Sequence, residues 1–87
     1  MAAAYVFLTD SGAVKTGPGL LVAVVLTASG AAQISVKDGG ASDSEFLGLR
    51  LAAAGSICFT PSHPVVFKSG CYVTVDSGTV EVTVIYI

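Results

Sequence analysis

Apolar and polar residues alternate most regularly at the C-terminal end of the chain, in residues 71–87 (CYVTVDSGTVEVTVIYI). A period of two is typical of a β-strand with one buried face. The two alternating runs flank the dipeptide Ser77-Gly78, which favours a tight hairpin turn. We therefore predict a C-terminal hairpin with an apolar face. That face holds three cross-strand pairs: Val75 with Val80, Val73 with Val82, and Cys71 with Val84.

Shorter runs of the same kind fill the rest of the chain, separated by turns that contain glycine or proline. These turns recur at intervals of about 8–12 residues, which is typical of a β-sandwich or barrel. We predict further strands at residues 5–9, 20–27, 32–37, 46–52, 56–60 and 65–68, with 20–27 and 32–37 joined as a second hairpin. The segment between residues 9 and 20 is interpreted as a glycine-rich connection that carries Lys15. The pattern predicts a single all-β domain over residues 1–87, a small antiparallel β-sandwich of about seven to eight short strands, with a barrel as the alternative.

Residues 20–27 differ from the other runs because they are apolar on both faces of the predicted strand. A strand of this kind is covered on both sides. The chain also ends inside an apolar strand, at Ile85-Tyr86-Ile87. We expect another subunit to provide the second cover. Six residues are predicted at this subunit interface: Leu20, Val22, Val24, Leu26, Ile85 and Ile87.

The composition also favours a protein partner. Of the 87 residues, 53% are apolar and 11% are charged, whereas about 25% of the residues of an average soluble domain are charged. Small domains often gain stability by forming oligomers. The longest uncharged apolar run, residues 20–26, is much shorter than the about 20 residues of a membrane-spanning helix. A net charge of −2 and scattered basic residues argue against nucleic acid. We expect neither a membrane nor a nucleic-acid partner.

Side chains with catalytic or metal-binding chemistry are few and isolated. His63, the single histidine, lies in a proline-bounded loop with no cysteine or carboxylate at ligand spacing. The aspartates mostly stand beside Gly or Ser at turns, where an Asp side chain caps the backbone: Asp10, Asp38, Asp43 and Asp76. The group Asp38, Asp43 and Glu45 lacks the alternating spacing of a calcium loop. We expect a protein that is not an enzyme and that holds no cofactor or metal.

The cysteines and tyrosines are interpreted as packing residues. Cys58 and Cys71 are expected to be reduced and buried, with a disulfide between them as the alternative. All three tyrosines lie within predicted strands, which favours packing or interface contacts over a sugar-binding platform. Tyr72 lies on the polar face of the predicted C-terminal hairpin, so it is the best placed of the three to contact a partner.

Several segments taken together resemble a known family. In chain order they read GPGLLVAVVLTASG, KDGG and FKSGCYVTVDSGTVEVTVIY, and the resemblance spans about residues 14–87. The chain is similar to the small all-β virion proteins of tailed bacteriophages, which often serve as head decoration (cement) proteins. The resemblance implies a sandwich or jelly-roll-like module that assembles in the host cytoplasm, forms a homotrimer on the capsid surface, binds the major capsid protein and bridges neighbouring capsomers. It brings no catalytic residues.

An N-terminal strand or arm, residues 1–12, is expected to reach the capsid or a neighbouring subunit. Five residues are predicted to make this contact: Tyr5, Val6, Phe7 and Leu8 in the arm, and Tyr72 in the C-terminal hairpin. Two other functions are alternatives to head decoration. One is a tail, fibre or baseplate module that binds a receptor or a carbohydrate, and the other is a bacterial β-sandwich module unrelated to phages.

Overall fold

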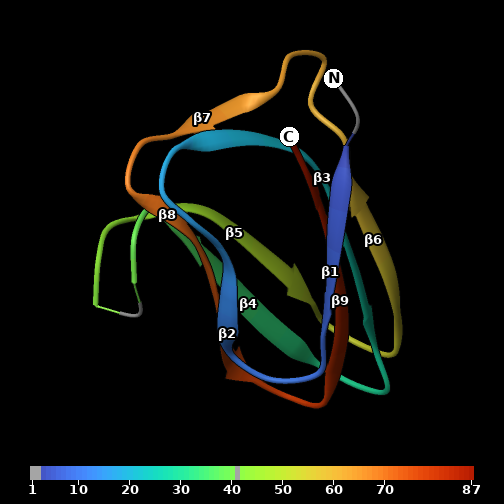
Figure 1. Ribbon diagram of the computed structural model, residues 1–87. Helices are drawn as coiled ribbons and strands as arrows, with labels where there is room; N and C mark the ends of the chain where they lie inside the picture. Colours follow the sequence, from blue (N-terminus) through green and yellow to red (C-terminus); the bar gives the residue numbers. More distant parts are fainter. Residues whose placement is uncertain (1–2, 41) are drawn as a thin grey trace.

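The computed structural model describes residues 3–40 and 42–87, and these residues form strands, turns and loops without a helix (Figure 1). The strands are β1 (Ala4–Leu8), β2 (Gly12–Thr16), β3 (Gly19–Ala28), β4 (Ala32–Lys37), β5 (Glu45–Leu51), β6 (Gly55–Phe59), β7 (Val65–Phe67), β8 (Gly70–Ser77) and β9 (Val80–Tyr86). The predicted all-β fold is confirmed. Within the described residues there is accordingly no helix that is long and apolar enough to cross a membrane.

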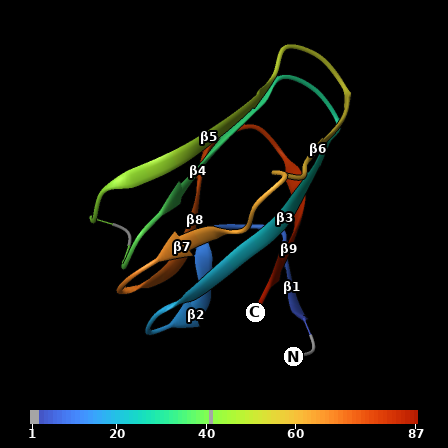
Figure 2. The same ribbon diagram turned by 90° about the horizontal axis from the view of Figure 1, so that it is seen from above.

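The strands form two antiparallel sheets packed against each other. Sheet A has the order β1-β9-β3-β6, and β7 pairs with the first residues of β3 beyond the end of β6. Sheet B has the order β2-β8-β4-β5. Seen from above, β4 and β5 lie on one side of the molecule, and β1, β9 and the C-terminus lie on the other (Figure 2). The sequence left sandwich and barrel open, and the two separate sheets identify a sandwich.

Both predicted hairpins are wrong. β8 and β9 belong to different sheets, and so do β3 and β4. Val73 of β8 instead pairs with Val36 of β4, while Val82 of β9 pairs with Leu26 of β3. The sequence pattern misleads here because two arrangements of consecutive strands give the same alternation. The strands can pair as neighbours in one sheet, or they can lie in different sheets that face each other across the core. In both cases the same side chains are buried. Alternation fixes which side of each strand is buried, but not its partner.

The strand order is that of a jelly roll, the double-sheet arrangement of two Greek keys. When β7 is left aside, the two sheets match position by position. The strands at equivalent positions are neighbours in the sequence: β1 and β2, β9 and β8, β3 and β4, and β6 and β5. The chain therefore crosses from one sheet to the other at most of its connections. The jelly-roll-like prediction is confirmed in this order of strands.

One strand was not predicted. β2 lies in the segment interpreted as a glycine-rich connection, and it pairs with β8 at the edge of sheet B. Only Val14 of its five residues is buried, and the pairing is interrupted by a register shift between Ala13 and Lys15. A short edge strand with one buried side chain has too little alternation to be recognised in a sequence.

The core fills the space between the sheets. Its fully buried side chains come from strands of both: Leu21, Val24 and Leu26 of β3, Ile34 and Val36 of β4, Phe67 of β7, Cys71 and Val73 of β8, and Val82 and Val84 of β9. Cys71 and Cys58 are both free thiols. Cys71 is buried as expected, but Cys58 is exposed because it alternates with the inward-facing Ile57 and Phe59 on the edge strand β6.

Two of the four aspartates, Asp10 and Asp43, cap their own turns as predicted, whereas Asp38 and Asp76 bind more distant groups. Asp10 Oδ1 accepts a hydrogen bond from the Ser11 N–H at 2.7 Å, and Asp43 Oδ2 accepts one from the Gly40 N–H at 2.6 Å. Asp38 accepts from the N–H groups of Lys68 and Ser69. Asp76 differs, since its carboxylate accepts the hydroxyl hydrogen of Ser35 on the neighbouring strand β4.

Candidate functional site

The outward side of sheet A is the part of the molecule with the chemistry of a binding surface, and we call it the outer face. On β1, Tyr5 is 74% exposed and Phe7 is 53% exposed, whereas the alternating Val6 and Leu8 pack against the core. Val66 of β7 is 63% exposed. These are the exposed large hydrophobic side chains of the described residues, and all three lie in sheet A.

Strand register places further apolar side chains beside them. Directly opposed residues of antiparallel strands point to the same side of a sheet. One row across sheet A is Tyr5–Ile85–Ala23, and the next is Phe7–Thr83–Val25–Cys58. A third row joins Ile87, Leu20 and Val66, with the Ile87 N–H donating to the Leu20 carbonyl at 2.9 Å. The outer face is therefore apolar along most of its length.

A β-bulge in β3 decides which residues join this face. The pairing of β3 with β9 shifts register between Leu21 and Ala23, so Val22 is an extra residue. An extra residue reverses the side to which the following residues point. Leu20 and Val22 are half-buried and lie outside the core cluster, whereas Val24 and Leu26 are fully buried inside it. The stripe expected from the sequence is split: Val24 and Leu26 pack within their own chain and leave another subunit nothing to contact.

The other predicted contact residues also divide between the two sheets. Ile85 and Ile87 lie on the outer face, and so do Tyr5 and Phe7 from the predicted N-terminal arm. Val6 and Leu8 pack on the core, and residues 1 and 2 of the arm lie outside the described residues. Tyr72 is half-buried on β8 of sheet B. The structure thus brings residues of both predicted sets together on one face, namely Leu20, Ile85, Ile87, Tyr5 and Phe7. Val24, Leu26, Val6 and Leu8 pack in or against the core, and Tyr72 lies in the other sheet.

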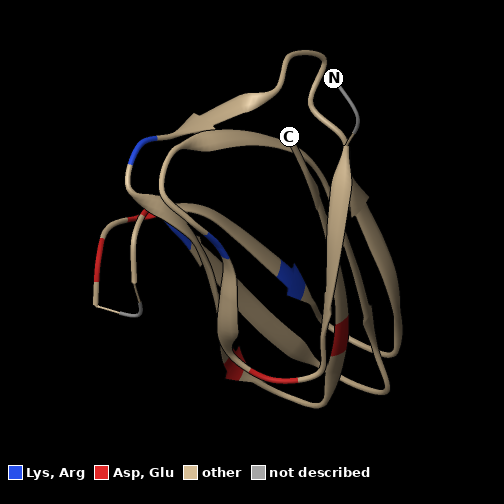
Figure 3. Ribbon diagram, in the orientation of Figure 1, with Lys and Arg blue, Asp and Glu red and all other residues tan. Residues whose placement is uncertain are grey.

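Charge is distributed very unevenly between the sheets. In the strands of sheet A, all of which are described, Glu81 is the only charged residue. The four basic residues lie in sheet B or at the corner beside it: Lys15 on β2, Lys37 on β4, Arg50 on β5 and Lys68 between β7 and β8 (Figure 3). Sheet B carries the mixed charge of an ordinary solvated surface, and the outer face of sheet A does not.

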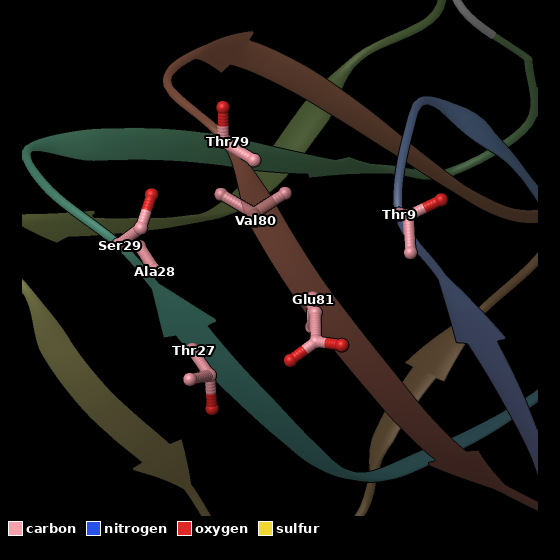
Figure 4. Close-up of a pocket in the computed structure, with 7 residues that line it drawn as sticks. All are labelled: Thr9, Thr27, Ala28, Ser29, Thr79, Val80 and Glu81. Atoms are coloured by element: carbon pink, nitrogen blue, oxygen red, sulfur yellow. The ribbon is translucent and has the colours of Figure 1, made fainter.

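One end of the outer face is polar. Thr27 of β3 pairs with Glu81 of β9 on one side and with Ser56 of β6 on the other. A pocket of about 470 Å³ opens there, lined by Thr9, Thr27, Ala28, Ser29, Thr79, Val80 and Glu81. Figure 4 shows Glu81 between Thr27 on β3 and Thr9 beyond the end of β1. We call this site the Glu81 pocket.

Sequence reasoning missed several residues of this surface. Val25 falls on the side of the strand 20–27 opposite to the predicted interface, and Val66 falls in the short predicted strand 65–68. Neither position differs in pattern from a core residue. Glu81 and Thr27 carried no signal of a pocket, since they are far apart in the sequence and meet only by strand pairing.

No group of three or more His, Cys, Asp and Glu side chains within the described residues is placed to hold a metal ion. Comparison of the chain with protein-family models, with curated proteins and with solved structures finds no match.

Proposed function

We propose that this protein is a structural virion protein of the head-decoration type, which forms a homotrimer and binds the major capsid protein on the capsid surface. The observation that carries the proposal is the outer face of sheet A, with Tyr5, Phe7 and Val66 exposed on a sheet that has one charged residue. Single exposed apolar side chains are ordinary on soluble proteins, but a contiguous group of them marks an interaction surface. Aromatic residues and few charges are typical of the centre of a protein interface.

The fold supports the same proposal with less weight. Jelly rolls occur in viral capsid proteins and in lectins, and an architecture alone does not determine a function. The resemblance of the sequence to phage decoration proteins favours the first of these settings. The alternative is a tail, fibre or baseplate module that binds a receptor or a carbohydrate. It gains less support, because the lining of the Glu81 pocket contains no aromatic side chain on which a sugar ring stacks.

The location of the protein on particles tests the proposal. We expect purified particles to contain many copies, in fixed proportion to the major capsid protein, and electron microscopy to place them on the outside of the head. A few copies at the tail, or none on particles, contradicts head decoration. Light scattering on the purified chain tests the trimer, and a stable, well-folded monomer contradicts it.

The reactivity of the Cys58 thiol measures whether the outer face is covered, and this test needs no mutation. It is an exposed free thiol in the same row as Phe7 and Val25, whereas burial, with a smaller contribution from Asp38, raises the pKa of Cys71 to about 11. A maleimide therefore reacts with Cys58 in the isolated folded chain and spares Cys71. On assembled particles we expect Cys58 to be protected from the reagent. Full labelling of Cys58 in the assembled state contradicts coverage of this face.

A further inference from the structure

The Glu81 pocket combines one carboxylate with several hydroxyl groups at the end of an apolar surface. Its lining contains the hydroxyl residues Thr9, Thr27, Ser29 and Thr79, while Ala28 and Val80 are buried side chains of the core at its base. Within the described part of the chain, the Glu81 carboxylate has no hydrogen-bond or ion-pair partner. The only charge in the strands of the outer face is therefore unpaired and borders a cavity.

The chemistry of the lining narrows the class of ligand. Calcium takes six to eight oxygen ligands, usually with several carboxylates, and this pocket supplies a single carboxylate. A sugar ring needs a stacking surface that the lining lacks. An ionised carboxylate only accepts hydrogen bonds, and hydroxyl oxygens accept them as well. Such a site fits a cationic donor, because hydrogen bonds between two ionised groups are roughly twice as strong as neutral ones.

We propose that the Glu81 pocket receives a basic side chain, lysine or arginine, from the protein that covers the outer face. This inference rests on the proposed function and names one feature of the partner's surface: an apolar area with a basic residue at its edge. A second copy of the chain packed face to face supplies no such residue, because the basic residues lie in sheet B or at the corner beside it. Face-to-face packing of two copies is therefore not the source, and we assign the basic side chain to the capsid protein that the proposed function names as the partner.

An ion pair in the Glu81 pocket would fix the orientation of the partner on the outer face. Apolar contact between sheets of alternating side chains is compatible with many relative positions, whereas one ion pair at the end of the surface fixes a single position and direction. Charge complementarity of this kind contributes more to specificity and to the rate of association than to affinity.

Arginine amide and its uncharged analogue citrulline amide test the pocket directly. In two-dimensional NMR spectra of the folded chain, we expect saturable shifts of the Thr27, Thr79 and Glu81 amides on addition of arginine amide. Citrulline amide has nearly the same shape without the charge, so we expect it to bind more weakly, by up to about fivefold. Added salt is expected to reduce the arginine shifts through screening.

Two matched variants complete the test. E81Q removes the charge of the pocket, and we expect it to abolish the difference between arginine and citrulline amides. E45Q makes the same chemical change at an exposed position of sheet B, and it is expected to bind as the unmodified chain does. Equal binding of the two amides to the unmodified chain, a preference for arginine amide that survives in E81Q, or no shift at the pocket each overturns the proposal.

Failure of this inference is distinguishable from failure of the proposed function. If Cys58 is protected on particles but the amides do not discriminate, the outer face is covered and the pocket is not a basic-group site. If arginine amide binds at the pocket but the protein is absent from particles, the pocket stands and head decoration fails.

Discussion

Asp38 shows how a single carboxylate connects distant parts of this fold. It follows β4, and its two oxygens accept the Lys68 N–H at 3.0 and 2.9 Å and the Ser69 N–H at 2.7 Å, in the connection between β7 and β8. The neighbouring Gly39 N–H donates to the Gly70 carbonyl at 3.1 Å. The hydrogen bonds from the backbone N–H groups of Lys68 and Ser69 hold the pKa of the Asp38 carboxyl below its ordinary value, and the Lys68 contribution is the largest.

The lowered pKa predicts how the Asp38 contribution to stability depends on pH. A carboxyl whose pKa is lower in the folded state stabilises the fold above its unfolded pKa of about 3.9, and this contribution is lost as the pH falls through the folded pKa. We expect Asp38→Asn to lower the urea midpoint at pH 7. The difference from the unmodified chain shrinks as the pH falls below about 4.

Asp10→Asn is the matched control, because Asp10 caps only the adjacent Ser11 N–H in an exposed turn. We expect it to change the urea midpoint little at any pH. A deficit in Asp38→Asn of the same size at neutral and acidic pH argues against the role of the charge.

At the scale of elements, the connections between the sheets carry the conformational constraints. β8 and β9 are joined by a short crossing in which Gly78 has a φ of 87°. A Cβ atom at this position lies 2.5 Å from the Ala31 carbonyl oxygen and 2.7 Å from the Ala32 Cβ. Gly78 therefore fits for two reasons, since it adopts a left-handed backbone conformation and allows the β3–β4 connection to approach.

Two glycine substitutions in neighbouring connections are predicted to have opposite effects. Gly78→Ala is expected to destabilise the fold by about 1–3 kcal/mol, because the new methyl group meets backbone atoms and the φ is unfavourable. In the β3–β4 connection, a Cβ atom at Gly30 meets nothing within 4 Å. Gly30→Ala is therefore expected to be neutral or to stabilise by up to about 1 kcal/mol. Urea unfolding measures both variants, and equal losses contradict the assigned geometry.

At the scale of the whole molecule, the two sides of sheet A have different roles. Phe67 is fully buried and packs closely on Gly19, whose Cβ position lies 2.7 Å from the Phe67 ring. Phe7 belongs to the same sheet and is exposed on the outer face. The inward side of the sheet stabilises the chain, and the outward side is available for a partner.

The same substitution on the two sides separates stability from assembly. Phe67→Ala is expected to cost about 3–5 kcal/mol of unfolding free energy, because it leaves a cavity in the core. Phe7→Ala is expected to change stability by no more than about 0.5 kcal/mol while weakening oligomerisation and particle binding. Urea unfolding measures the first property, and light scattering with particle co-sedimentation measures the second. Normal assembly of Phe7→Ala contradicts the role of the outer face.

The sequence by itself determined the strands and their buried sides. The alternation of apolar and polar residues located eight of the strands. It also identified Val73 and Val82 as core residues, because a strand with one buried side has an apolar residue at every second position. Turn chemistry predicted the capping roles of Asp10 and Asp43, whereas the hydrogen bonds of Asp38 to the distant β7–β8 connection carried no local signal. The excess of apolar residues indicated a surface that needs a protein cover, and Tyr5, Phe7, Leu20 and Ile85 were among the residues expected there.

Tertiary structure decided how these strands pair and which apolar residues remain outside. β8 and β9 face each other across the core instead of forming a hairpin, since alternation is the same in both arrangements. The extra residue at Val22 turned Val24 and Leu26 inward, and a bulge depends on the pairing with β9, not on a local pattern. The Glu81 pocket joins Thr9, which follows β1, with residues in or beside β3 and β9, so it exists only once those strands are neighbours. The positions of the strands could be predicted from the local sequence, whereas the binding surface depends on the pairing of strands that are far apart in the sequence.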